Sequence, residues 1–317
     1  MQGKILLIHI DRQDQRSLYR ILRSTRSHLD FTDDLAECRR RLDEDAWDLL
    51  IVDHDHLGPE GVALLLELGT TRPELKILLL SQERDKQRLV ELFRAPFLTN
   101  LVAKAGEIAA DELVVTVEKI LRNDVFGLEK YLTWGIEPEL EVLTSSREKD
   151  QKLTLLASFA DTLGLPSRLT TLAKGVADEL LMNAVYNAPV DAEGRPRYAH
   201  LPRTERIDLG PGEEVDLRWA CDGRHLAISV TDPFGSLEVN TIRQYLARCF
   251  ARGDDQMATH GGGAGMGLFY IFTSLSQLIV NIDPGQRTEV IGLLDVTGSY
   301  RDFAQRPKSF NVFLQRR

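Results

Sequence analysis

The sequence predicts an α/β protein built from two units, a doubly wound parallel sheet followed by a mixed sheet with helices on one face. Three observations support this prediction. The chain has 317 residues, a length typical of two domains. Its first part alternates short apolar runs with helix-length segments. Its last part contains a hairpin and three further apolar strands. The predicted ranges are 1–122 for the first unit, 123–151 for a connector and 152–317 for the second unit.

The net charge indicates which partners to expect, and the cysteines indicate the cellular compartment. The formal net charge of −9 and the pI near 5.4 argue against a general binder of nucleic acids or anionic membranes, since both need clustered Lys and Arg. Cys38, Cys221 and Cys249 lack metal or redox spacing, which indicates a reduced compartment. The apolar run 4–10 is too short for a signal or membrane-spanning segment. We therefore expect a cytoplasmic protein whose partners are proteins or small molecules.

Five apolar runs mark the strands of the first unit. Each run is followed by a helix-length segment, as expected where right-handed crossovers place helices on both faces of a parallel sheet. Functional residues of such folds gather at the carboxyl ends of the strands. Asp53, Ser81 and Lys104 end the third, fourth and fifth runs. The runs are KILLIHI (4–10), LDFT (29–32), WDLLIVD (47–53), LKILLLS (75–81) and LTNLVAK (98–104).

These strand ends resemble the receiver domain of two-component response regulators, which has a flavodoxin-like fold. The resemblance covers about 120 residues, and three positions match in order. It implies that Asp53 is the possible phosphoacceptor. It also places Ser81 at the hydroxyl position of the family and Lys104 at its lysine position.

One departure from the receiver pattern concerns the metal. The two consecutive acids that hold Mg²⁺ in the family fall on His9 and Ile10, and an isoleucine cannot ligate a hard cation. Asp11 would reach the site only after a register slip. Two interpretations stay open: a pseudo-receiver that serves as a dimerisation or docking module, and a receiver that still accepts phosphate at Asp53. The residues 54–56 suggest metal ligands, but we interpret them as a solvated loop because no complete ligand set is nearby.

The range 123–151 has the features of a connector. Gly127, Gly135 and Pro138 interrupt any long helix, and a helix is expected to resume near Leu153. The first part of the connector is too apolar for a free tether, so we expect it to pack on one unit or on a second copy of the chain. Its apolar residues are Phe126, Leu128, Tyr131, Leu132 and Trp134.

The stretch KGVADELLMNAVYNA (174–188) predicts an amphipathic helix at the centre of the second unit. Glu179 and Asn183 lie four residues apart, so their side chains meet on one face, and Asn187 continues the row. An amide oxygen is a hard ligand for Mg²⁺, and a carboxylate can orient or deprotonate a nucleophile. The apolar stripe consists of Val176, Leu180, Leu181, Ala184 and Val185.

A hairpin follows a long insertion at 189–214. The stretch EVDLRWACDGRHLAISVTD (214–232) contains two strands joined at Asp222-Gly223. The second strand ends at Asp232, and a backbone turn follows at Gly235. A carboxylate at this position can accept the exocyclic amine of adenine. An Asx turn that closes the strand is the alternative interpretation.

The stretch HGGGAGMGLFYIF (260–272) predicts a phosphate cradle. Its glycines let the backbone amides approach an anion, and the helix that begins near Leu268 adds a favourable dipole. The P-loop signature is absent. The polar residues 252–259 are candidates for a lid. Three further strands are expected at 276–282, 288–296 and 309–315.

Together the carboxylate-amide helix, the strand-end aspartate and the glycine-rich stretch resemble the GHKL ATP-binding superfamily, which includes histidine kinases, anti-sigma serine kinases, gyrase and Hsp90. The resemblance covers about residues 150–317 and implies an α/β sandwich that binds ATP and Mg²⁺. Phe234 and Ser236 depart from the D-x-G-x-G pattern of the family. The implied roles are catalytic base for Glu179, metal ligand for Asn183, and nucleotide contacts for Asn183, Asn187, Asp232, Gly235, Gly263, Gly265 and Gly267.

The function that we expect is cytoplasmic signalling, with the receiver-like unit controlling the ATP-binding unit. No histidine occurs between Gly61 and Ala199, which argues against autophosphorylation on the usual histidine helix. The closer likeness is to anti-sigma serine kinases, which bind or phosphorylate a protein partner. An ATP-binding interaction module without transfer chemistry is the alternative, and a histidine kinase acting on a separate phosphotransfer protein is a third. A homodimer is expected.

Overall fold

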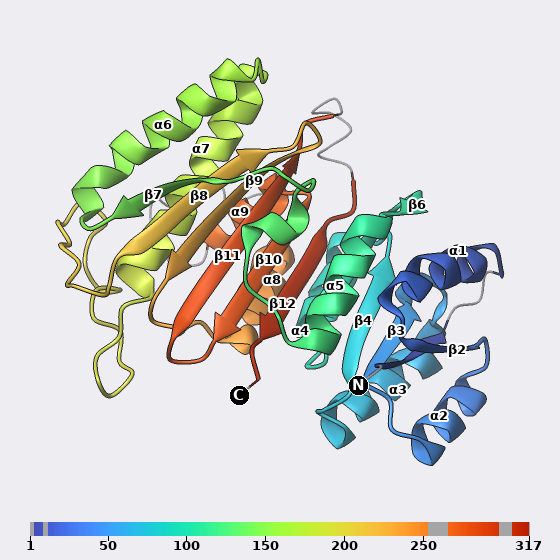
Figure 1. The fold of residues 1–317 in the computed structure, drawn as a ribbon. Coiled ribbons are helices and arrows are strands. Elements are labelled where there is room, and N and C mark those ends of the chain that lie inside the picture. The colour runs from blue at the N-terminus through green and yellow to red at the C-terminus, as the bar shows by residue number, and fades with distance from the viewer. Residues whose placement is uncertain (1–2, 9–11, 253–265, 298–305, 317) are drawn as a thin grey trace.

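One mixed β-sheet runs through both halves of the molecule (Figure 1). The computed structural model describes residues 3–8, 12–252, 266–297 and 306–316. Within them, the strand order is β2-β1-β3-β4-β5-β12-β10-β11-β9-β8-β7, and the short β6 pairs with β5 alone. The N-terminal half (residues 3–122) and the C-terminal half (residues 139–316) therefore lie side by side along one sheet.

The N-terminal half is a doubly wound parallel sheet, as the sequence predicts. Its strands pair in the order 2-1-3-4-5, the order of flavodoxin-like folds. Helices α1 and α5 pack on one face, and α2, α3 and α4 pack on the other. The strands are β1 (Lys4–Ile8), β2 (His28–Thr32), β3 (Leu49–Asp53), β4 (Lys76–Ser81), β5 (Asn100–Ala105) and β6 (Glu107–Ile108). The helices are α1 (Arg12–Leu22), η1 (Arg23–Thr25), α2 (Leu35–Glu44), η2 (His54–His56), α3 (Gly58–Thr71), α4 (Lys86–Arg94) and α5 (Ala110–Arg122).

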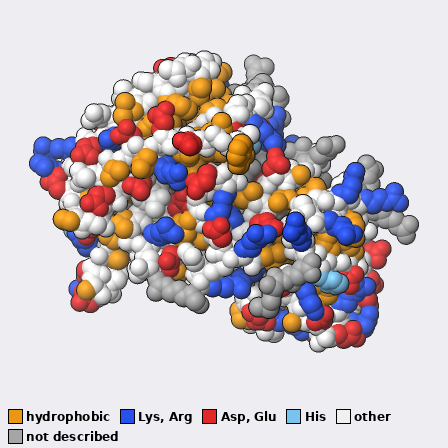
Figure 2. Space-filling view, in the orientation of Figure 1, with side chains coloured by type: hydrophobic (Ala, Val, Ile, Leu, Met, Phe, Trp, Pro, Cys, Tyr) orange, Lys and Arg blue, Asp and Glu red, His pale blue; other side chains and the backbone are white. Residues whose placement is uncertain are grey.

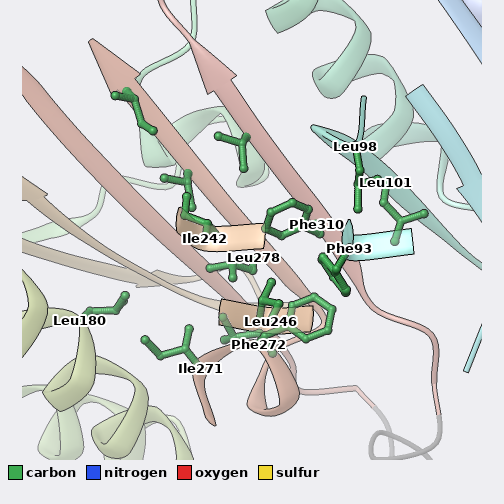
Figure 3. Packing of buried hydrophobic residues seen from close by; sticks show 14 of the residues in the cluster. Phe93, Leu98, Leu101, Leu180, Ile242, Leu246, Ile271, Phe272, Leu278 and Phe310 are labelled. Carbon is green, nitrogen blue, oxygen red and sulfur yellow. The ribbon is translucent and has the colours of Figure 1, made fainter. Parts of the chain in front are cut away.

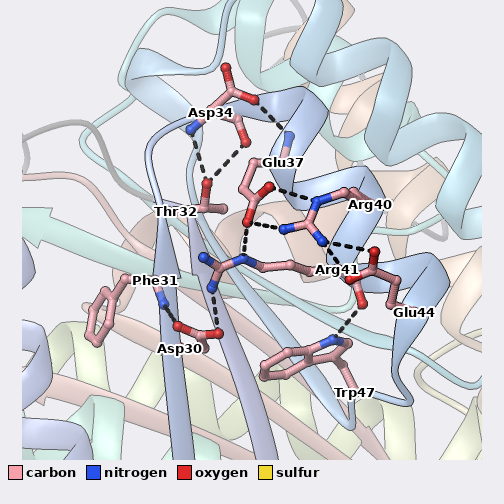
Figure 4. Close-up of polar contacts among 9 residues, drawn as sticks. All are labelled: Asp30, Phe31, Thr32, Asp34, Glu37, Arg40, Arg41, Glu44 and Trp47. Atoms are coloured by element: carbon pink, nitrogen blue, oxygen red, sulfur yellow. Dashed lines mark hydrogen bonds and ion pairs between the residues drawn. The ribbon is translucent and has the colours of Figure 1, made fainter.

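The start of α2 shows how local sequence fixes an outer helix (Figure 4). The carboxylate of Asp34 accepts a hydrogen bond of 2.6 Å from the backbone N–H of Glu37 and so caps the helix. Glu37 then pairs with Arg40 and Arg41 on the next turn. Arg41 also pairs with Asp30 of β2. These pairs lie at the surface, with Glu37 and Arg41 half-buried, and connect the helix to the strand. Pairs of this kind contribute little to stability, about 0–1 kcal/mol each.

The C-terminal half is a mixed sheet that packs on helices α6 to α9 (Figure 1). Its strands are antiparallel to their neighbours except that β10 and β12 run parallel. The strands are β7 (Glu139–Leu143), β8 (Val215–Cys221), β9 (His225–Asp232), β10 (Gln277–Asp283), β11 (Arg287–Asp295) and β12 (Ser309–Leu314). The helices are η4 (Ser146–Glu148), α6 (Lys149–Thr162), α7 (Ser167–Met182), the π-helical turn η5 (Asn183–Asn187), α8 (Val239–Arg252) and α9 (Met266–Ser274). The short helix η3 (Leu128–Tyr131) belongs to the connector that precedes this half.

The connector packs on the face of the C-terminal sheet opposite α6 to α9. Val125 and Leu128 are buried there against β9 to β12, together with Ile120 of α5. Trp134, in contrast, is almost fully exposed. The short helices η3 and η4, the strand β7 and the start of α6 lie within the range 123–151 that the sequence predicts as connector. The alternation of Glu139, Leu140, Glu141 and Val142 marks β7 as an edge strand only once β8 is known to pair with it.

The two halves meet through the sheet and through a common aromatic core. Strand β5 pairs with β12 in antiparallel orientation, with Leu101 opposite Phe310. Next to this junction, α4 packs against α8. The ring of Phe93 of α4 meets the rings of Phe272 and Phe310 edge to face, with centroid-to-centroid distances of 5.5 and 5.2 Å (Figure 3). One hydrophobic core therefore continues across both halves.

Two surface properties bear on the expected partners. On the face drawn in Figure 2, the described Lys and Arg side chains are interspersed with Asp and Glu. A mixed surface of this kind lacks the single-sign field that attracts nucleic acids or anionic lipids. Among the described residues, no helix combines the length and the apolar character needed to span a bilayer.

Candidate functional site

Helix α7 and the π-helical turn after it carry the carboxylate-amide row. The sequence predicts one regular helix over 174–188, but the α-helical pattern ends at Met182 and continues as a π-helical turn over Asn183–Asn187. In this turn Asn187 Nδ2 donates a hydrogen bond of 2.8 Å to Asn183 Oδ1. Single π-turns are frequent at functional sites. The predicted apolar stripe is confirmed, because Val176, Leu180, Leu181, Ala184 and Val185 are all buried.

Glu179 lies directly against Gly267 of α9. A Cβ atom built on Gly267 would stand 2.0 Å from Glu179 Oε2, so only glycine leaves room for the carboxylate at its present position. A second glycine keeps the helices close, since a Cβ on Gly175 of α7 would stand 2.3 Å from the hydroxyl of Tyr270. The structure thus brings together the first and third of the three predicted pieces.

The environment of Glu179 favours its protonated form more than water does. Partial burial raises the pKa of the Glu179 carboxyl, and the neighbouring Asp178 adds to this effect, while Arg203 and Lys149 oppose it. A carboxylate with a raised pKa is a better proton acceptor at neutral pH. This is the property that a general base needs.

Arg203 contributes to the site although sequence analysis missed it. It belongs to the insertion 189–214, which has no periodicity that would single out one side chain. Its Nη1 donates to the backbone carbonyl of Met182 at 2.8 Å, and its Nη2 donates to Asn187 Oδ1 at 3.3 Å. The guanidinium also lies 5.1 Å from the centroid of the Tyr186 ring. Arg203 therefore fixes which end of the Asn187 amide faces Asn183.

Asp232 ends β9 and is almost completely buried, with 6% of its surface exposed. Its Oδ1 accepts a hydrogen bond of 3.0 Å from the backbone N–H of Phe234, so the Asx turn considered above is present. Burial raises the pKa of Asp232 to about 7, although hydrogen bonds from Phe234 and Gly235 favour the charged form. A carboxyl group that titrates near neutrality can accept or donate one further hydrogen bond.

Gly235 and Ser236 shape the turn after Asp232. Gly235 has a positive φ of 59°, and a Cβ there would stand 2.2 Å from the backbone oxygen of Asp283. The hydroxyl of Ser236 donates to the backbone oxygen of Ala188 at 2.7 Å. The turn is thereby joined to the residue that follows the π-helical turn. Ser236, a departure from the GHKL pattern, has a structural role in this chain.

Two features of the described residues bear on whether a magnesium-bound nucleotide fits here. The amide of Asn183 offers the type of oxygen that Mg²⁺ accepts, whereas the Cβ side of Gly267, near the start of α9, is occupied by the Glu179 carboxylate. Among the described residues, no group of three or more His, Cys, Asp or Glu could hold a metal ion by itself. A metal here would therefore depend on ligand oxygens as well. Gly263, Gly265 and the predicted lid residues 253–259 lie outside the described residues.

A second group of polar side chains, which we call the strand-end pocket for its buried contacts among Asp53, Asp55, Ser81 and Lys104, lies at the carboxyl ends of β3, β4 and β5. Asp53 is buried, and its Oδ2 accepts a hydrogen bond of 2.5 Å from Lys104 Nζ. Burial alone would lower the pKa of the Lys104 ammonium, but the hydrogen bonds and charges of Asp53 and Asp55 outweigh burial and raise it. His56 Nδ1 lies 3.1 Å from the same Asp53 oxygen. The structure thus places the three receiver-like positions at one edge of the sheet.

Asp55 belongs to this pocket, contrary to the expectation of a solvated loop at 54–56. Its Oδ1 accepts a hydrogen bond of 2.6 Å from the Ser81 hydroxyl, and Lys104 Nζ lies 3.3 Å from its Oδ2. The short helix η2 turns Asp55 inward, because Asp53 Oδ1 accepts the backbone N–H of Asp55 at 3.0 Å. The D-x-D spacing at a strand end was the available signal. His9, Ile10 and Asp11 lie outside the described residues.

Comparison with known proteins adds little to this geometry. No family model and no curated protein matches the chain. Among solved structures, it is similar to the signal receiver domain of an HD domain-containing protein from Pseudomonas fluorescens Pf-5, with 20% identity over 38% of this chain and 96% of that one and a TM-score of 0.35. It is also similar to RcsB from Salmonella enterica serovar Typhimurium bound to promoter rprA in the presence of BeF₃⁻, with 16% identity over 50% and 82% and a TM-score of 0.32. Scores this low support no inference about function.

Proposed function

We propose that this chain is a cytoplasmic signalling protein in which the receiver-like half controls a GHKL-type ATP-binding half. The proposed activity is that of an anti-sigma-type Ser/Thr protein kinase or partner-switch protein, which transfers the γ-phosphate of ATP to a protein. The observation that carries the proposal is that Glu179 lies against Gly267, where α7 meets α9, while the paired amides of Asn183 and Asn187 follow on the next turns of the same helix.

Each residue of the proposed site has a separate role. Asn183 would hold Mg²⁺, which offsets the charge of the phosphates when bound. Glu179 would take the proton from a Ser or Thr hydroxyl of the partner, a role that fits its raised pKa. Asp232 would bind the exocyclic amine of adenine at the end of β9. Arg203 would position Asn187 and, through it, Asn183.

Control by the N-terminal half is supported by the way the halves pack. The helix that follows β4, α4, lies against α8 of the ATP-binding half, and Phe93 contacts Phe272 of α9. Gly267, the second residue of α9, is the glycine that lies directly against Glu179. A change in the pocket at the end of β4 therefore has a short, packed route to the proposed nucleotide site.

Titration with a fluorescent ATP analogue, with and without Mg²⁺, tests the nucleotide site. We expect saturable binding to the wild type, and a loss of affinity of about tenfold or more in Asp232→Ala, equivalent to about 1.4 kcal/mol. Asn183→Ala should weaken binding only when Mg²⁺ is present. The matched control is Asp216→Ala on the neighbouring strand β8, which should bind as the wild type does. Equal affinities of the two aspartate variants would refute the adenine role of Asp232.

The transfer reaction needs a separate assay. The protein would be incubated with labelled ATP and serine-bearing candidate partners of the anti-sigma-antagonist type. Glu179→Ala should abolish labelling of the partner. The variant should still bind the fluorescent ATP analogue. If this variant transfers phosphate as fast as the wild type, Glu179 is not the catalytic base. The proposal that the site binds a nucleotide would still stand.

An ATP-binding module without transfer chemistry is the second candidate. One observation favours it: Asn183 Oδ1, the proposed metal ligand, already accepts a hydrogen bond from Asn187, which leaves a single lone pair for a metal. If this bond persists with nucleotide bound and weakens the hold of Asn183 on Mg²⁺, ATP would act by changing the surface offered to a partner. Tight binding with negligible turnover in the presence of partners would favour this function.

A further inference from the structure

Three hydrogen-bond donors converge on the carboxylate of Asp55. The Ser81 hydroxyl lies 2.6 Å from Oδ1, the backbone N–H of Gln82 lies 2.9 Å from Oδ2, and Lys104 Nζ lies 3.3 Å from Oδ2. Ser81 and Lys104 stand at the hydroxyl and lysine positions of the receiver pattern, where the resemblance implies an anion. We propose that in this chain the side chain of Asp55 serves as that anion.

The chemistry of the donors points to an oxyanion. A hydroxyl, a backbone amide and an ammonium approach one planar group from two strand ends, the first at Oδ1 and the other two at Oδ2. Lys104 is nearly buried, so its attraction for the carboxylate is weakly screened. Any small anion with two or more oxygens, such as phosphate, sulfate or acetate, would satisfy the same donors.

The charge balance explains why a second anion would not enter beside Asp55. Among the described residues, the buried ammonium of Lys104 lies between the carboxylates of Asp53 and Asp55, and His56 Nδ1 lies 3.1 Å from Asp53 Oδ2. A phosphoryl group would bring further negative charge beside these two carboxylates. Asp55 therefore competes with every external oxyanion, including one attached to Asp53.

The internal anion also fixes the segment that leads to α4. Ser81 Oγ donates to Asp55 and accepts the backbone N–H of Glu83 at 3.0 Å, so the hydroxyl orients the turn that precedes the helix. The N-terminal half is thereby held in an anion-bound arrangement without a phosphoryl donor. This inference does not depend on nucleotide binding by the other half.

Anion rescue of Asp55→Ala tests the proposal. This variant should melt at a lower temperature than the wild type, because the three donors lose their internal acceptor. Sodium phosphate or sulfate should restore the melting temperature in a saturable manner, compared with sodium chloride of equal ionic strength. The double variant Asp55→Ala/Ser81→Ala should lose most of the rescue, because one of the three donors is gone.

Two controls separate a site from general salt effects. Phosphate and sulfate stabilise many proteins weakly, so the wild type defines that background. Asp45→Ala removes an exposed aspartate that pairs with Lys4 at 2.7 Å in the same half, and it should show the background response alone. Equal stabilisation of Asp55→Ala, Asp45→Ala and wild type by phosphate would overturn the proposal.

A second variant covers the case in which Asp55→Ala does not fold. Asp55→Asn keeps the shape and one acceptor oxygen but removes the charge, so the site should bind external phosphate weakly. The readout is the NMR chemical shift of the Gln82 amide during titration with phosphate, which should move in Asp55→Asn and stay constant in the wild type. An equal shift in both proteins would show that Asp55 does not occupy an anion site.

Discussion

The ring of Phe93 lies parallel to the ring of Phe250, with the centroids 5.7 Å apart and the planes 8° apart. Phe93 belongs to α4 of the receiver-like half, and Phe250 belongs to α8 of the proposed ATP-binding half. Both rings are buried in the core that crosses the molecule. The β5–β12 pairing lies beside these rings, so backbone hydrogen bonds and side-chain packing join the two halves in the same region.

Phe93→Ala should therefore weaken both halves together. Removal of a buried phenyl ring typically costs about 3–5 kcal/mol, and here the cavity would border α8, α9 and β12 as well as the receiver-like sheet. We expect the urea-unfolding transitions of the two halves to shift to lower denaturant by the same amount. Leu66→Ala, which truncates an exposed leucine of α3, is the control and should change stability by about 0.5 kcal/mol or less. Destabilisation confined to one half would contradict the shared core.

Gly267→Ala should displace the Glu179 carboxylate without unfolding the protein. The added Cβ would stand 2.0 Å from Glu179 Oε2, but a carboxylate at the end of a flexible side chain can swing away. Replacement of glycine inside a helix also favours folding by about 0.5–1 kcal/mol. We expect a melting temperature close to that of the wild type and a loss of phosphotransfer comparable to that of Glu179→Ala.

The double variant Glu179→Ala/Gly267→Ala identifies the cause of that loss. If Gly267→Ala acts by moving Glu179, the double variant should be no less active than either single variant, because the two changes remove the same interaction. Additive losses would show that Gly267 has a separate role, such as close backbone approach to the nucleotide.

The sequence predicts strands and burial better than it predicts which polar side chains meet. The runs that end at Asp53, Ser81 and Lys104 are apolar on both faces, so their place in a parallel sheet follows from composition. The inward turn of Asp55 does not follow from composition. It depends on hydrogen-bond donors of residues 81, 82 and 104, which come from β4 and β5, later in the chain. Local pattern cannot distinguish it from a solvated acid.

The same limit applies to the proposed nucleotide site. The spacing of Glu179 and Asn183 predicts a common face, since helical geometry is local. The π-helical turn that pairs Asn183 with Asn187, and the insertion that brings Arg203 to it, depend on tertiary packing. The junction of β5 with β12 is likewise a pairing of strands from opposite ends of the chain, and neither strand carries a sequence signal for its partner.

Asp232→Asn should stabilise the ligand-free protein above neutral pH. The folded pKa of Asp232 is about 7, against 3.8 in the unfolded chain, so between these values the folded state holds a proton that the unfolded state has released. The free energy of unfolding therefore falls as pH rises through that window. Asparagine can still accept the N–H of Phe234 but carries no charge. We expect a gain of about 1–3 kcal/mol at pH 8 and little change at pH 4.

Urea denaturation at the two pH values measures this difference. Asp45→Asn, at an exposed position, is the control and should show no gain at pH 8. If Asp232→Asn is more stable at pH 8 and also binds the ATP analogue more weakly, the wild-type carboxylate is retained at a cost in stability, as is common at binding sites. Equal stability of wild type and Asp232→Asn at pH 8 would mean that the buried carboxylate carries no such cost.

Lys119→Met should change how stability depends on pH. Lys119 of α5 is buried against the C-terminal sheet, where its Nζ donates to Tyr131 OH at 2.7 Å and Asn281 Oδ1 at 2.8 Å and lies 4.1 Å from the centroid of the Phe313 ring. Burial lowers its pKa to about 6 from 10.5, although Glu289 opposes the shift. Between these values the unfolded chain holds a proton that the folded protein lacks, so this residue makes the free energy of unfolding rise with pH.

Methionine cannot titrate, so Lys119→Met should lose that rise between pH 6 and 9. The expected difference in slope from the wild type approaches about 1.4 kcal/mol per pH unit as an upper limit. The sign at a single pH is less informative, because the variant also leaves Asn281 and Tyr131 without one partner, which costs about 1–3 kcal/mol at every pH. Lys86→Met, on the exposed start of α4, should keep the wild-type slope. Identical slopes in urea titrations of wild type and Lys119→Met would show that Lys119 remains protonated at the junction of the two halves.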